Sequence, residues 1–200
     1  MEVLKGLHNF ISKQSKEKTK NPELAFDDRS LEVIRKIYEV DNPSLHEIPF
    51  LGVVDENEQV EEIIYEPDFP RQSRLRQTGN AVFTSTVDKN ELVYLFRQAQ
   101  SVGKLDSVRM VGHLHPSGKT QLGQLKVIVP PSEDALIPSK SDISFMGALG
   151  ESNPDFNFDY TAITANTPDG HKLRVYNTRQ LLKTKKVKNL DKLPNQTIDL

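Results

Sequence analysis

Two histidines and one aspartate are the residues of this chain whose types and spacing could do chemistry. His113 and His115 stand one residue apart in the run HLHP at 113–116, and Asp142 ends the run PSKSD at 138–142. On a β-strand, side chains two residues apart point to the same face. Catalytic zinc sites use three protein ligands, His and Asp or Glu among them, and keep a fourth position open. The pattern therefore predicts a three-ligand metal site and a metal-dependent hydrolase.

Composition limits what such a site can contain and where it can work. The 200 residues include no cysteine, so only His, Asp or Glu can bind a metal. The formal net charge of -2 argues against a general nucleic-acid or membrane-surface binder. No run is apolar enough to span a membrane, and the N-terminal residues lack a secretory apolar segment. The expected location is the cytoplasm, with no membrane partner.

The elements that must position these residues mix helices and strands without strict alternation. Apolar residues at helical spacing predict helices over 29–40, from Asp88 to Gly103, and over 139–149. Period-two patterns predict strands near 46–54, 60–65, 81–86, 108–115, 125–129, 156–164 and 172–176. An α+β domain, or a three-layer αβα domain whose mixed sheet is flanked by helices, is the expectation.

The chain divides into three parts by composition. Residues 1–24 form a polar, Lys-rich N-terminal extension with a possible amphipathic helix over 3–11, and 25–178 form the domain. Residues 117–138 are expected to be an insertion within it, and 67–80 a polar loop. Residues 179–200 are expected to be a Lys-rich C-terminal tail.

A structural interpretation of the same residues stays open. Ser139 and Asp142 also match a capping box at a helix start, worth about 0.5–2 kcal/mol of helix stability. Two histidines on a strand can simply be surface residues. The two motifs together, a strand ending in HxHP and a helix opening with SxxD, favour the metal site.

The paired motifs carry a family resemblance. HLHP followed by PSKSD resembles the JAMM motif, HxHP…SxxD, of the MPN domain family of zinc-dependent peptidases and isopeptidases, and HPSG at 115–118 resembles its RadC-like members. The resemblance covers roughly residues 31–176. It implies an MPN/cytidine-deaminase-like fold and one Zn²⁺ per chain, held by His113, His115 and Asp142.

The resemblance also implies two catalytic residues. Glu47, in the segment HEIPFLG at 46–52, best matches the family's early glutamate and would act as general base toward a water activated by zinc. Ser139 would hydrogen-bond the tetrahedral oxyanion, a role that competes with capping. The competitors of Glu47 lie on the next strand: Glu61, Glu62 and Glu66.

The chain departs from the family pattern in two places. The spacer 117–138 contains 22 residues, more than the short turn usual in the family. Pro49 follows Glu47 closely and cannot donate a ladder hydrogen bond, so it needs an edge position or a bulge. The remaining histidines, His8, His46 and His171, are expected to be surface or supporting residues and not metal ligands.

The resemblance suggests substrates as well. Its known activities act on peptide or isopeptide bonds after the Gly-Gly tail of ubiquitin or ubiquitin-like proteins, and such a tail would bind as an added strand along the insertion. A shorter peptide fits the motif equally. Two alternatives remain: an inactive MPN-type scaffold, or a RadC-like nucleic-acid-associated protein. The basic segments 71–76 and 183–192 permit the latter, and the net charge disfavours it.

Overall fold

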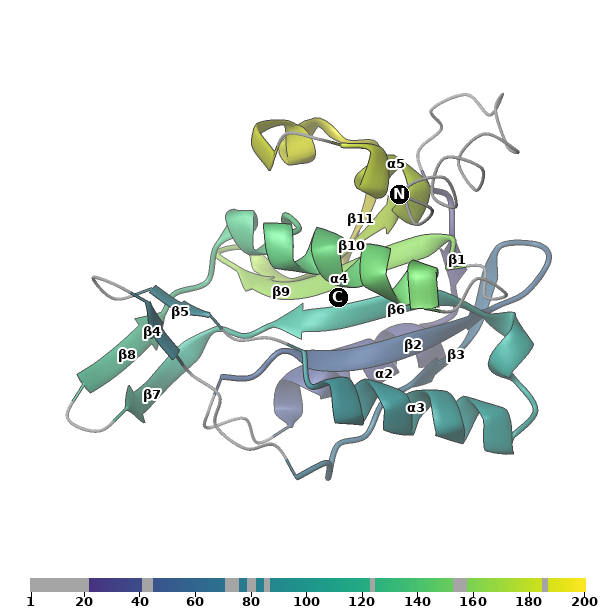
Figure 1. Cartoon of the computed structure of the whole chain (residues 1–200), viewed down its shortest axis with the longest axis horizontal. Coiled ribbons are helices and arrows are strands. Elements are labelled where there is room, and N and C mark those ends of the chain that lie inside the picture. The colour runs from purple at the N-terminus through teal and green to yellow at the C-terminus, as the bar shows by residue number, and fades with distance from the viewer. Residues whose placement is uncertain are drawn as a thin grey trace, which may run out of the picture.

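The central feature of the molecule is a seven-stranded mixed sheet with helices on both faces (Figure 1). The structure is a computed structural model, and it describes residues 22–40, 45–70, 76–78, 82–84, 87–122, 125–152, 158–184 and 187–200. The α+β class expected from the sequence is confirmed. The predictions for residues 1–21, including a helix over 3–11, lie outside the described residues.

The strands of the sheet run in the order β1-β3-β2-β6-β9-β10-β11. Their bounds are Ala25–Phe26 (β1), Ile48–Val54 (β2), Gln59–Ile64 (β3), Val108–His115 (β6), Tyr160–Thr167 (β9), Gly170–Asn177 (β10) and Asn195–Asp199 (β11). β6 lies at the centre, antiparallel to β2 and parallel to β9. Its last residue is His115, so the histidine motif ends a strand that has neighbours on both sides.

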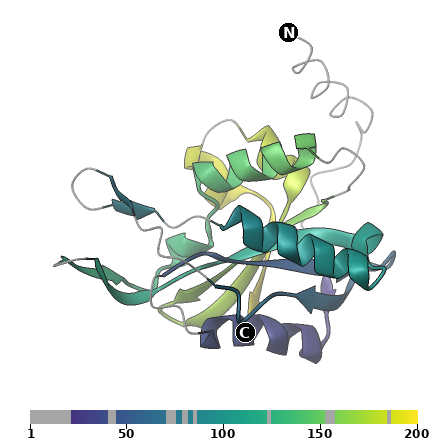
Figure 2. The same ribbon diagram turned by 60° about the horizontal axis from the view of Figure 1, so that its bottom comes forward.

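Two hydrophobic clusters cover the two faces of the sheet. On one face, α2 (Asp28–Glu39) packs Ile34 and Ile37 against Phe50 and Met110. On the other face pack α3 (Lys89–Ser101) and α4 (Lys140–Ser152), whose cluster includes Val111 of β6. Figure 2 shows the sheet between α2 and these two helices. Since side chains alternate along a strand, His113 and His115 share the face of Val111.

Local sequence signals explain where the helices begin. Asp27 caps α2 by accepting a 2.7 Å hydrogen bond from the Ser30 N–H, and Asp88 caps α3 by accepting one of 2.9 Å from the Asn90 N–H. α4 starts directly after Ser139 as expected, but it continues past Gly150 to Ser152. Within the described ranges, no helix combines the length and the apolar character needed to cross a membrane.

Pro49 lies where the sequence analysis required it. β3 pairs with β2 only from Leu51 onward, whereas β6 already pairs with β2 at Ile48 and Pro49. Pro49 therefore has a paired strand on one side only, and such a position tolerates a residue without an N–H.

The expected loop over 67–80 is wrong in part. β4 (Arg76–Thr78) pairs with β5 (Val82–Thr84) in a small hairpin. The strand expected over 81–86 is thus the second arm of that hairpin. The strand expected over 156–164 is described from Tyr160 and extends to Thr167.

The expected C-terminal tail is also wrong. Residues 178–183 form α5 (Thr178–Lys183), and a 3-10 helix, η3 (Val187–Lys192), leads into β11, which pairs with β10 along its whole length. Leu181 and Leu190 are fully buried. The segment is rich in lysine, so its few buried apolar residues gave only a weak sequence signal. The edge strand β11 needs only one neighbouring strand.

The insertion over 117–138 has two separate parts. β7 (Gly118–Leu122) and β8 (Leu125–Val129) form a hairpin that projects from the end of the sheet (Figure 1), where the sequence predicted only the second strand. A short 3-10 helix, η2 (Glu133–Leu136), then returns to contact β9 and β10. The two parts can therefore serve different purposes.

Gly112 permits the close packing of β6 against β2. A Cβ added at Gly112 would lie 2.2 Å from Cζ of the fully buried Phe50. Gly112→Ala should therefore lower the free energy of unfolding by about 1–3 kcal/mol through overpacking. Gly150→Ala is the matched control, because nothing lies within 4 Å of its added Cβ inside α4. It should raise stability by about 0.5–1 kcal/mol. Urea unfolding of both variants gives the comparison; equal stabilities would contradict it.

Candidate metal centre

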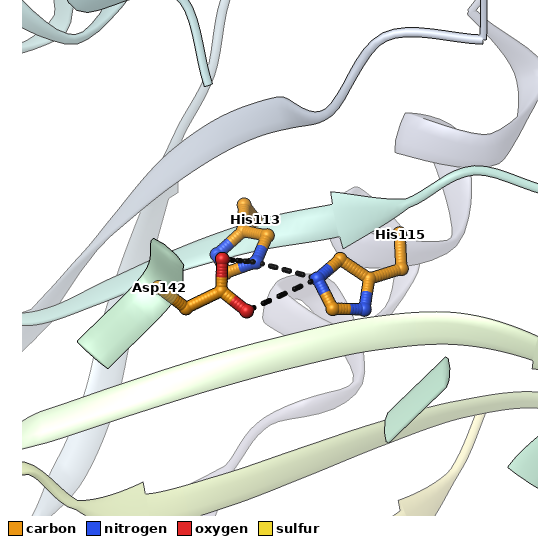
Figure 3. Close-up of side chains that lie close together, drawn as sticks. All are labelled: His113, His115 and Asp142. Atoms are coloured by element: carbon orange, nitrogen blue, oxygen red, sulfur yellow. Dashed lines mark hydrogen bonds and ion pairs between the residues drawn. The ribbon is translucent and has the colours of Figure 1, made fainter. Parts of the chain in front are cut away.

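His113, His115 and Asp142 converge in the structure. β6 supplies both imidazoles, and the first turn of α4 brings the carboxylate over them (Figure 3). The two Nε2 atoms lie 2.9 Å apart, and Asp142 places Oδ1 3.5 Å from His113 Nε2 and Oδ2 3.5 Å from His115 Nε2. His113 and Asp142 are each 5% exposed. In the described part of the chain, this is the one group of three or more such side chains whose donor atoms gather around a point.

The spacing of the donor atoms fits a metal ion. One ligand atom from each residue can be chosen so that all three lie within 4.8 Å of one another. Tetrahedral zinc with ligands at about 2.0–2.1 Å needs donor atoms ~3.4 Å apart. The two Nε2 atoms, 2.9 Å apart, are closer than that value, and each lies 3.5 Å from a different carboxylate oxygen of Asp142. The three residues can therefore hold a small divalent ion without rearrangement of the backbone.

A backbone carbonyl fixes the orientation of His115. Its Nδ1 lies 2.5 Å from the carbonyl oxygen of Ala135, in η2. A carbonyl can only accept, so Nδ1 must carry the proton and donate. When His115 is neutral, its lone pair is on Nε2, the atom that can bind a metal. When His115 is protonated, the Nε2–H faces the Asp142 carboxylate, 3.5 Å away. Such outer partners of a metal-binding imidazole fix its tautomer and ring orientation.

Asp142 takes part in the cap of α4 and in the His–Asp group at the same time. The Ser139 N–H donates to Asp142 Oδ2 at 2.6 Å, and the Asp142 N–H donates to Ser139 Oγ at 3.2 Å. This reciprocal pair is a capping box with Asp in the place of Glu. It anchors the carboxylate at the start of α4 while both of its oxygens still face the imidazoles.

The charges of the site stabilise one another. Burial raises the pKa of Asp142, but hydrogen bonds with His113 and His115 outweigh burial and hold its pKa well below the usual range. Burial likewise lowers the pKa of His115, but Asp142, Glu47 and the Ala135 carbonyl raise that pKa overall. The protein thus favours a carboxylate anion here, the form that binds a metal.

Glu47 lies beside this group. It directly precedes β2 and has the strand parity of Leu51, which packs in the α3/α4 cluster. Burial raises the pKa of Glu47, although the charges of His113 and His115 and a hydrogen bond from the Val87 N–H lower it. A carboxylate with a raised pKa near a metal site has the property of a general base.

The competitors of Glu47 make contacts elsewhere. Glu62 pairs with Lys104 at 2.5 Å, and Glu66 accepts a hydrogen bond from Gln98 at 3.3 Å. Glu61 is exposed on β3. Of the four glutamates considered, Glu47 is the one whose charge raises the pKa of His115.

Ser139 stands at the start of α4 with its hydroxyl already engaged. Its Oγ accepts from the Asp142 N–H and lies 2.6 Å from Ser141 Oγ. Accepting the N–H uses a lone pair, so the O–H proton remains available to the exposed Ser141 or to a substrate. Capping and donation to an oxyanion therefore need not exclude each other.

The remaining histidines have other surroundings. His171 stacks on Tyr38, with ring centroids 3.8 Å apart and planes 9° from parallel. His46 is buried, one residue before Glu47 and hence of opposite strand parity. His8 lies outside the described residues.

Sequence reasoning missed the Ala135 carbonyl. A backbone acceptor has no residue type to recognise, and η2 lies inside a segment interpreted as an insertion around the substrate. Sequence reasoning also missed Tyr176 of β10. Its hydroxyl donates a hydrogen bond to the Leu136 carbonyl at 2.8 Å, and the two residues are 40 positions apart in the sequence. No local pattern encodes either contact.

The pairing of His115 with Asp142 predicts a pH-dependent stability in the metal-free protein. Because folding lowers the pKa of Asp142, the ionised carboxylate stabilises the folded protein at pH values above 3.8, the ordinary pKa of the group. This contribution is lost in acid. Because folding raises the pKa of His115, the protonated imidazole stabilises the folded protein at pH values below 6.5, the ordinary pKa of the group. This contribution is lost as the pH rises through the pKa of the folded protein. With a chelator present, Asp142→Asn should cost about 1–3 kcal/mol between pH 4 and 6.5 and less at pH 9. Denaturant unfolding across this range measures it; a pH-independent difference would contradict it.

Comparison with models of known protein families gives no match, and comparison with curated proteins finds no significantly similar sequence.

Proposed function

We propose that this protein is a zinc-dependent hydrolase of peptide or isopeptide bonds. The observation that carries the proposal is the convergence of two imidazoles and one carboxylate on a buried face, with a further carboxylate of raised pKa beside them. Three protein ligands leave a coordination position open for a water or substrate. The JAMM resemblance of the same residues points to the same chemistry.

Zinc is the proposed ion because of the donor set. Imidazole nitrogen and carboxylate oxygen suit zinc, and the chain offers no thiolate. When bound by His113, His115 and Asp142, zinc would polarise the substrate carbonyl and lower the pKa of a water. Two histidines and one carboxylate also suit iron(II), but a neighbouring carboxylate base favours hydrolysis.

The protein's own groups account for the proton transfers. Glu47, as general base, would take a proton from the attacking water and deliver it to the leaving amine, which would otherwise depart as a strong base. Its raised pKa suits both tasks, since a carboxylate of ordinary pKa holds the proton too weakly to receive it from water. Ser139 would turn its O–H from Ser141 toward the oxyanion and keep the cap on Asp142.

The substrate we propose is an extended chain end, as in the Gly-Gly tail of a ubiquitin-like protein. β7 begins at Gly118, three residues after His115, so the β7–β8 hairpin leads directly away from the metal ligands. In the described part of the chain this hairpin is a separate two-stranded sheet with outer edges, and an extended peptide can pair with such an edge. A short peptide remains the alternative substrate.

Metal content tests the proposal directly. Purified protein supplied with zinc should hold about one ion per chain, and His113→Ala should lose it because two ligands cannot retain the ion. His171→Ala is the matched control, since His171 stacks on Tyr38 and does not belong to the converging group, and it should keep the ion. Elemental analysis after dialysis gives the result.

Two outcomes would count against the proposal. Absence of metal from the wild-type protein would leave the HxHP and SxxD motifs as strand-end and capping features, and would favour the scaffold alternative. Iron in place of zinc, with oxygen-dependent chemistry, would identify a different reaction class.

Glu47→Gln tests the base. The amide keeps the size of the side chain and cannot accept the proton, so turnover should fall about 10²–10⁴-fold while zinc content stays unchanged. Glu62→Gln, which disturbs only a partly exposed ion pair with Lys104, should keep full activity. The assay is release of a fluorescent amine from a ubiquitin-like protein C terminus and from a short Gly-Gly peptide. Full activity of the Glu47 variant would assign the base elsewhere.

A further inference from the structure

We propose that Tyr176 is a positioning residue of the metal centre: its hydroxyl holds the η2 helix in place, so that the Ala135 carbonyl can orient His115. The inference rests on the metal site of the proposed function. Tyr176 lies on β10, and β6, β9 and β10 are consecutive neighbours in the sheet. It also assigns a purpose to the second half of the 117–138 segment.

Tyr176 makes a buried and specific contact with η2. The side chain is 1% exposed, and its hydroxyl donates to the Leu136 carbonyl at 2.8 Å. Leu136 is itself fully buried. A buried carbonyl that lost this donor would be left without its partner, so the contact strongly restrains where Leu136 can lie. Ala135 is the adjacent residue.

Other polar contacts of η2 with the sheet lie at its start. Ser132 donates its N–H to the Asn166 carbonyl at 3.1 Å, just before the helix. Glu133 pairs with Lys172 at 2.8 Å and lies 3.8 Å from Arg174, but its side chain is about half exposed. Exposed ion pairs contribute little to stability. The Tyr176 hydroxyl is thus the buried side-chain group that binds the other end of η2. This end holds Ala135, whose carbonyl accepts from His115.

The effect should reach the metal through one intermediate group. The Ala135 carbonyl accepts from His115 Nδ1 at 2.5 Å, which keeps Nε2 on the side of the ring that faces Asp142. If η2 shifts, His115 can rotate or change tautomer, and one of three ligands then points less well at the ion. Loss of an outer partner of a metal ligand typically costs 10–100-fold in metal affinity.

Tyr176→Phe removes only the hydroxyl, and Tyr38→Phe is a matched control. Tyr38 also hydrogen-bonds through its hydroxyl, to Thr164 Oγ1 at 3.1 Å, but it belongs to α2 on the opposite face of the sheet. Zinc affinity would be measured by competition with a chromogenic chelator, and the ligand geometry by the visible absorption of the Co²⁺-substituted protein. Thermal unfolding with a chelator present reports on stability alone.

Tyr176→Phe should weaken zinc binding 10–100-fold and alter the Co²⁺ spectrum, whereas Tyr38→Phe should bind zinc within twofold of the wild type. If both variants lose stability but keep the wild-type affinity and spectrum, Tyr176 is merely structural and the inference is overturned. A wild type that binds no zinc would overturn the proposed function as well, so the two failures are distinguishable.

A second variant keeps the inference testable if Tyr176→Phe does not fold. Thr120 and Val127 are paired across the β7–β8 hairpin, so residues 121–126 can be replaced by an Asn-Gly turn between them. This shortens the hairpin, keeps the buried Val127 and leaves η2 intact. Zinc affinity within twofold of the wild type supports η2 as the part of the segment that serves the metal. Loss of zinc would show that the hairpin does so, and would overturn the inference.

Discussion

The burial of the Asp142 carboxylate against two imidazoles is the interaction on which the rest of this site depends. A buried carboxylate is costly unless hydrogen bonds or opposite charge compensate it. Here His113 and His115 face both of its oxygens, and the Ser139 N–H adds a further donor. The result is a preformed cluster of donor atoms that is stabilised by hydrogen bonds and opposite charge from neighbouring groups. A bound cation would satisfy the same atoms more completely.

The architecture explains how the cluster stays in place without flexible loops at its centre. Both histidines stand on β6, which has paired strands on either side, and Asp142 stands in the capped first turn of α4. Gly112, which directly precedes His113 on β6, lets the Phe50 ring pack closely against the strand. Rigid elements hold ligands more accurately than loops do. His115, at the end of its strand, is oriented by another segment, through the Ala135 carbonyl.

Several features could be predicted from the sequence because they depend on local rules. Alternation along a strand put His113 and His115 on one face, and the caps at Asp88 and Ser139 set the starts of α3 and α4. Pro49 required a position with one neighbouring strand, and it has one. The expected Lys-rich tail failed because pairing of β11 with β10 depends on a partner, not on the composition of residues 195–199. Side-chain patterns of such short polar strands carry little signal.

The sequence by itself determined the chemistry available: two imidazoles at strand spacing, a carboxylate in a capping box, and no thiolate. Only the tertiary structure decided that these groups meet, because Asp142 is 27 residues from His115 and reaches it by the packing of α4 on the sheet. It also decided the tautomer of His115, through the Ala135 carbonyl, and the setting of Glu47 beside the group. Distances between segments arise from packing, and a backbone carbonyl carries no residue type that a sequence pattern could reveal.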